Sequence, residues 1–90
     1  MQIWKYVMEE ADCTFEMPKG AEVLSCQTQD DLPVIWALVD ENAPKEKRHF
    51  VGLETGSGVD YPKNQLKFID TVQASGIVNH VFEVLSQNQL

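Results

Sequence analysis

Cationic side chains are scarce in this sequence, which has 7 Lys plus Arg against 14 Asp plus Glu and a formal net charge of −7. Non-specific binding to duplex nucleic acid depends on neutralising phosphates with cations, and anionic membranes also attract cations. We therefore expect no duplex nucleic acid and no membrane among the partners. A small anion in a local basic pocket, or a basic partner protein, remains compatible with this charge, as does acidity that serves solubility alone.

Cysteine and long apolar runs are also scarce. Cys13 and Cys26 are too few for a disulfide scaffold, and their spacing is not that of a CxxC metal or redox pair. The opening stretch "MQIWKYVMEE" reaches a double glutamate too soon for a signal-peptide core or a membrane span. His49 and His80 lack the supporting ligands of a zinc site. We expect a cytoplasmic protein with no metal and no cofactor.

Nucleotide-binding signatures are missing from the one glycine-rich stretch, "ETGSGVDYPKNQ" at 54–65. It has neither the GxxxxGK[ST] of a P-loop nor the GxGxxG of a dinucleotide fold, and no helix pattern follows it. Backbone N–H groups around Thr55, Gly56, Ser57 and Gly58 can still form a small anion nest, with hydroxyl groups from the threonine and the serine. The alternative is a flexible turn without a ligand.

Short apolar runs separated by turn residues predict an all-β, mainly antiparallel fold. Seven strands are expected, at 2–8, 14–17, 22–28, 34–40, 48–54, 67–73 and 77–84. The last run also has helical spacing at Ile77, Val81, Val84 and Leu85, but its β-branched and aromatic content favours a strand. We predict a single-domain sheet, sandwich or partly open barrel over 1–85, with a frayed polar tail at 86–90.

Turn chemistry and alternation add detail to this prediction. "MPKGAE" predicts a tight turn at Gly20, and "QDDLP" predicts a hairpin. The run at 34–40 is apolar on both faces, so it is expected to be a central strand with Trp36 in the core. Trp4 is expected on an edge strand, where a second subunit could pair.

Four groups that are or can become cationic, Lys45, Lys47, Arg48 and His49, fall within "APKEKRHF". Against a net charge of −7, they predict a local positive patch that receives a phosphate or carboxylate. Glu46 dilutes the patch, and a solvated loop needs no ligand to be basic. His80 alternates with Val78 and Phe82, so it points inward or lines a groove. No catalytic residue is assigned.

Four segments carry a family resemblance: "IWKY", "EMPKGAEVLSCQTQDDLPVIWALVD", "ETGSG" and "IDTVQASGIVNHVFEV". Together they resemble a family of small phage and prophage proteins of uncharacterised domain type. The matching positions are Trp4, Lys5, Met17, Pro18, Gly20, Ala21, Trp36, Ala37, Leu38, Val39, Thr55, Gly56, Thr71, Val72, Gln73, His80, Val81, Phe82 and Glu83. The resemblance implies a mobile-element context, the cytoplasm of a host cell, and a role in which small phage proteins inhibit bacterial immunity by binding.

Three hypotheses follow from the sequence. In the first, a non-enzymatic homo-oligomer sequesters a small, cyclic nucleotide immune signal where its "KEKRH" and "TGSG" loops meet at a subunit interface. In the second, an acidic surface binds and inhibits a host defence protein. The third is a small phosphodiesterase that uses His80 or His49, for which no paired base, nucleophile or metal cluster is visible.

Overall fold

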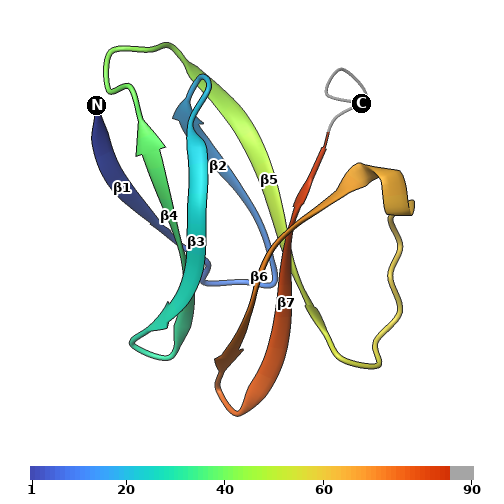
Figure 1. Cartoon of the computed structure of the whole chain (residues 1–90). Coiled ribbons are helices and arrows are strands. Elements are labelled where there is room, and N and C mark those ends of the chain that lie inside the picture. The colour runs from blue at the N-terminus through green and yellow to red at the C-terminus, as the bar shows by residue number, and fades with distance from the viewer. Residues whose placement is uncertain (86–90) are drawn as a thin grey trace.

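Seven antiparallel strands and one short 3-10 turn make up the fold of the computed structural model, which describes residues 1–85 (Figure 1). The strands are β1 (Gln2–Val7), β2 (Asp12–Pro18), β3 (Glu22–Gln29), β4 (Leu32–Val39), β5 (Lys45–Glu54), β6 (Leu66–Ala74) and β7 (Ile77–Val84), with η1 (Lys63–Gln65) before β6. The predicted all-β fold is confirmed, and the run at 77–84 is a strand. The predicted tail at 86–90 lies outside the described residues.

The strands divide into two sheets. Sheet I has the order β1-β4-β3 and sheet II the order β2-β5-β7-β6. They do not close into a barrel, but β3 lies along β6, where the Cys26 N–H donates to Asp70 Oδ2 at 3.4 Å and Thr28 Oγ1 donates to the Gln73 carbonyl at 2.6 Å. These bonds hold the sheets together along one side, because each joins a backbone group of one edge strand to a side chain of the other.

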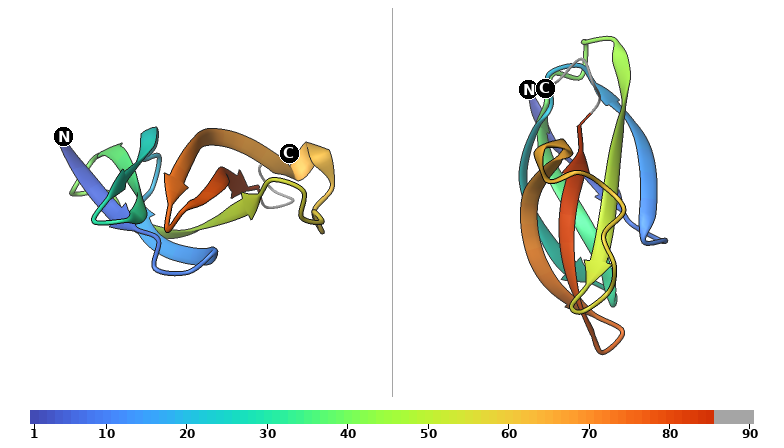
Figure 2. Two further views of the ribbon diagram at one scale, coloured as in Figure 1. Left: turned by 90° about the horizontal axis from the view of Figure 1, so that it is seen from below. Right: turned by 90° about the vertical axis from the view of Figure 1, so that its right-hand side faces the viewer.

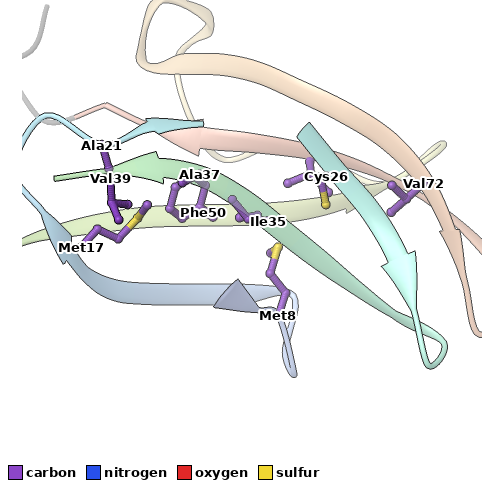
Figure 3. Packing of buried hydrophobic residues seen from close by; sticks show 10 residues of the cluster. Met8, Met17, Ala21, Cys26, Ile35, Ala37, Val39, Phe50 and Val72 are labelled. Carbon is purple, nitrogen blue, oxygen red and sulfur yellow. The ribbon is translucent and has the colours of Figure 1, made fainter. Parts of the chain in front are cut away.

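The core lies between the sheets, because alternate residues of each strand point inward. Figure 3 shows Ile35 and Ala37 of β4 with Phe50 of β5 and the sulfur atoms of Met8, Met17 and Cys26. The buried cluster comprises Met8, Met17, Ala21, Cys26, Ile35, Ala37, Val39, Phe50, Val72 and Val81. Small and flexible side chains dominate this cluster, and Phe50 is its one aromatic ring.

Both predicted turns are present. Gly20 has φ +81° in a turn closed by a bond from the Ala21 N–H to the Pro18 carbonyl, a conformation that favours glycine. Asp30 and Asp31, with φ 52° and 64°, form the two-residue hairpin loop between β3 and β4. The Asp31 carboxylate accepts bonds from the Ser75 N–H at 2.8 Å and hydroxyl at 3.1 Å. This contact ties a turn of sheet I to the β6–β7 turn of sheet II.

β4 is the central strand of sheet I, as predicted, but the prediction that Trp36 lies in the core is wrong. Ile35 and Ala37 point inward, so Trp36 is half-buried on the outer face, where the Lys5 ammonium lies 5.9 Å from its ring centroid. Trp4 is on the edge strand β1, as expected, and packs partly against the core with the Lys45 ammonium 4.6 Å from its ring. Two apolar faces on one strand cannot be assigned to core and surface from alternation alone.

Candidate binding groove

The outer face of sheet II carries an apolar row that faces away from the core. Phe50 and Val81 point inward, so their neighbours on β5 and β7 point outward. Strand register then places Leu53 beside His80, and Phe68 beside Phe82. The Phe68 and Phe82 rings meet edge to face, with centroids 5.5 Å apart. Phe68 is 56% exposed, which is unusual for an aromatic side chain inside a strand.

The segment between β5 and β6 turns this apolar row into a groove. Figure 2 (left) shows the segment, in yellow and orange, on the side of the molecule away from the N-terminus. Two depressions of about 390 and 540 Å³ share Val59, Leu66 and Phe82, and we call them together the outer groove. It is lined by Leu53, Glu54, Thr55, Gly56, Ser57, Val59, Tyr61, Lys63, Leu66, Phe68, His80 and Phe82. Its lining is mostly apolar and its long side is open to solvent.

One end of the outer groove is polar. His80 lies between two hydroxyl groups, with its Nε2 2.7 Å from Thr55 Oγ1 and its Nδ1 3.0 Å from Thr71 Oγ1. A neutral imidazole has one donor and one acceptor nitrogen, so one hydroxyl accepts from the ring and the other donates to it. The ring is held in a fixed orientation, and neither nitrogen contacts a carboxylate.

The glycine-rich loop forms the wall at this end. Ser57 is committed to the turn, because its N–H and its hydroxyl donate to the Glu54 carbonyl at 3.2 and 2.8 Å. Gly56 has φ +87°, which the turn requires. Within residues 1–85, the amides of Gly56 and Gly58 have no backbone acceptor. Of the predicted nest, the Ser57 amide is used by the turn, and the two glycine amides remain available to an anion.

The four residues of the predicted basic patch are dispersed. The stretch at 45–49 is the start of β5 and not a loop, so successive side chains point to opposite faces. Lys45 covers the Trp4 ring, and Lys47 is exposed opposite Glu16 of β2. His49 lies on the outer face, where its Nε2 is 2.6 Å from Asp12 Oδ1 and its ring meets Tyr61 edge to face.

Arg48 points in the other direction, into the protein. Its Nε and Nη2 donate to the two oxygens of Glu83 at 2.5 and 2.8 Å, and Nη1 donates to the Ala21 carbonyl at 2.7 Å. The hydrogen bonds with Glu83 raise the pKa of the guanidinium. A bidentate pair with side chains 10% and 3% exposed is part of the interior, so we leave Arg48 out of the candidate site.

The structure therefore places Lys47 and His49 on the outer face of β5, whereas Lys45 covers the Trp4 ring and Arg48 points into the interior. None of the four lines the outer groove, which the loop at 55–58 borders. Sequence reasoning missed the apolar half of the groove: Phe68, Tyr61, Leu66 and Val59. The usable signal was the alternation of His80 with Phe82, which placed a histidine and an aromatic ring on one face. Residues 1–85 contain no His, Cys, Asp and Glu group that could hold a metal ion, and no helix there is long and apolar enough to cross a membrane.

Fold and site together define a class: a small two-sheet antiparallel β domain with an aromatic-lined groove on the outer face of one sheet. The chain belongs to the family described as "Domain of unknown function (DUF7352)", whose match covers residues 1–90. No curated protein and no solved structure matches the chain.

Proposed function

We propose that this protein acts by binding, without catalysis, and that the outer groove holds the base of a small nucleotide. The observation that carries the proposal is the exposed Phe68 ring, which meets the half-buried Phe82 ring edge to face in an open apolar groove. Bases stack on exposed aromatic rings whatever their sequence, and each such contact contributes about 1–3 kcal/mol. Surface rings that serve no ligand would instead reduce solubility.

The ends of the groove supply the polar contacts that such a ligand needs. Gly56, Thr55 and His80 line one depression, and Lys63 lines the other. Backbone amides and a lysine ammonium both suit a phosphate. The groove histidine, His80, has hydroxyl partners on both ring nitrogens and no carboxylate to orient it as a base, and His49, which does contact Asp12, does not line the groove.

The biological setting that we propose rests on the sequence resemblance. We propose a phage-encoded protein in the host cytoplasm that sequesters a nucleotide immune signal. The expected pocket at a homo-oligomer interface stays a prediction. Of the basic residues that were to line it with the glycine-rich loop, Lys45 covers the Trp4 ring and Arg48 pairs with Glu83.

Replacing Phe68 tests the groove directly. Phe68→Ser should weaken nucleotide binding roughly 10- to 100-fold, because it removes one stacking surface. Leu24→Ser is the matched control, since Leu24 is similarly exposed, at 47%, but belongs to sheet I. Native mass spectrometry would first identify a ligand in a panel of cyclic di- and trinucleotides and ADP-ribose derivatives. Calorimetry would then measure its affinity for the wild-type protein and the two variants. Equal affinity in the two variants, or an empty protein across the panel, would contradict the proposal.

A second candidate function is inhibition of a host protein through an acidic surface. A cluster of carboxylates around one surface depression favours it. Glu9, Glu10 and Asp31 border one depression of about 180 Å³, although they come from two different connections. A complex formed there should weaken steeply with salt. Glu9→Gln/Glu10→Gln should reduce capture of the host partner in a pull-down, and Glu22→Gln on β3 should not. Capture that is insensitive to salt and to both changes would exclude this candidate.

A further inference from the structure

Each sheet has two edge strands, β1 and β3 in sheet I and β2 and β6 in sheet II. An edge strand presents unpaired N–H and C=O groups on alternate residues and pairs with another chain unless something blocks it. Common blocks are a neighbouring element, a β-bulge, a proline and charged side chains. The four edges of this fold differ in these features.

Three of the edges are blocked. β3 and β6 lie against one another, joined by the bonds from Cys26 to Asp70 and from Thr28 to Gln73, and each contains an interruption in its register. β2 ends at Pro18 and carries two carboxylates, those of Asp12 and Glu16, which would repel the same strand of a second copy.

β1 has the fewest of these features, with one charged side chain and no other block. It pairs with β4 from Gln2 to Val7 without interruption and contains no proline and no acidic residue. Figure 1 shows it at the margin of sheet I, with no strand beyond it. Its outward side chain Ile3 is 61% exposed. The single charge, on Lys5, is held near the Trp36 ring and donates to Gln29 Oε1 at 2.7 Å.

From this comparison we infer that β1 is a self-association edge, where the same strand of a second copy pairs antiparallel about a two-fold axis. The product is one continuous sheet with the order β3-β4-β1-β1-β4-β3. A pair centred on Trp4 places Lys5 opposite the partner's Ile3, so the two lysines do not face one another. The chain has a formal net charge of −7, so two copies repel one another. This repulsion opposes association least at an edge strand that contains no carboxylate.

If β1 pairs in this way, the dimer Kd should depend on the sign of a charge introduced at position 3. Native mass spectrometry and light scattering should show a dimer of twice the 10.2 kDa chain. Ile3→Lys should raise the dimer Kd roughly 10-fold, because two symmetric pairs of like charges then face each other across the strands. Ile3→Glu should keep the dimer, because the new carboxylate faces the partner's Lys5. Leu24→Lys on β3 is the control and should leave the Kd unchanged.

A second measurement guards against misfolding of a variant. In the wild-type protein, hydrogen exchange at β1 amides should slow as protein concentration rises, while exchange in β2 should not change. A wild-type monomer, equal Kd values for Ile3→Lys and Leu24→Lys, or exchange in β1 that is independent of concentration would overturn the inference. The outer groove lies on the other sheet, so loss of the dimer and loss of nucleotide binding are separable results.

Discussion

Arg48→Ala is expected to lower the free energy of unfolding by about 3–5 kcal/mol, because it leaves the Glu83 carboxylate buried without its partner. Glu83 is 2% exposed, and both of its oxygens accept from Arg48. The Ala21 carbonyl loses a donor at the same time. Small domains have a total stability of about 5–15 kcal/mol, so this one change removes a large part of it.

Urea unfolding followed by circular dichroism measures the effect, with Lys47→Ala as the control. Lys47 is the neighbouring exposed cation on β5, and its loss should change stability by no more than about 0.5 kcal/mol. The double variant Arg48→Met/Glu83→Leu should recover most of the loss, since apolar pairs of similar volume replace buried ion pairs well. A single-variant loss below about 1 kcal/mol would show that the pair is not buried in solution.

This prediction also bears on how ligand binding can be tested. Arg48→Ala would reduce binding of any ligand by destabilising the protein, so weaker binding in this variant is not evidence for a basic patch. Phe68 and Leu24 avoid this problem because both side chains are already exposed.

Stability should also fall between pH 9 and pH 11, by up to about 3 kcal/mol, through the thiol of Cys26. Cys26 is 0% exposed and belongs to the buried core cluster (Figure 3). Burial, and then the Asp70 carboxylate, raise the pKa of this thiol from 9.0 to about 11. The unfolded chain therefore loses the proton near pH 9, whereas the folded protein keeps it until about pH 11. Each pH unit between these values costs about 1.4 kcal/mol.

The thiol can be separated from other groups by comparing variants. Burial also raises the pKa of Tyr6, which adds to the alkaline loss in every variant. Cys26→Ala should flatten the decline of unfolding free energy between pH 9 and pH 11, and Cys13→Ala, at a partly exposed thiol, should preserve it. In native buffer, a thiol reagent should modify Cys13 long before Cys26. Equal alkaline slopes for the two variants would refute the assignment.

Local chemistry made most of the fold predictable. β-Branched and aromatic residues at 77–84 favoured a strand over a helix, and sheet pairing with β5 and β6 confirms it. Proline, glycine and paired aspartates marked the turns at 18–21 and 29–32, because these residues satisfy dihedral requirements within a few positions. The prediction for Trp36 was wrong because β4 has two apolar faces. On such a strand, only packing against the other sheet decides which face is core.

The candidate site was less predictable, because it depends on contacts distant in the sequence. The loop at 55–58 was visible as a glycine-rich stretch, but the aromatic wall needs β6 beside β7 and the segment at 59–65 beside both. The residues at 45–49 do not form the predicted positive patch, because they belong to a strand. Once β5 begins at Lys45, neighbouring residues point to opposite faces, and Arg48 meets Glu83, 35 residues away.

By itself, the sequence determined that this is an acidic, all-β domain with seven strands and recognisable turn sequences. Strand propensity, alternation and turn dihedrals each depend on only a few neighbouring residues. The tertiary structure alone decided the order of strands in each sheet, the face that became core, the burial of Arg48 against Glu83, the outer groove and the least blocked edge at β1. Each of these depends on which distant residues become neighbours, and packing between sheets, not local preference, selects them.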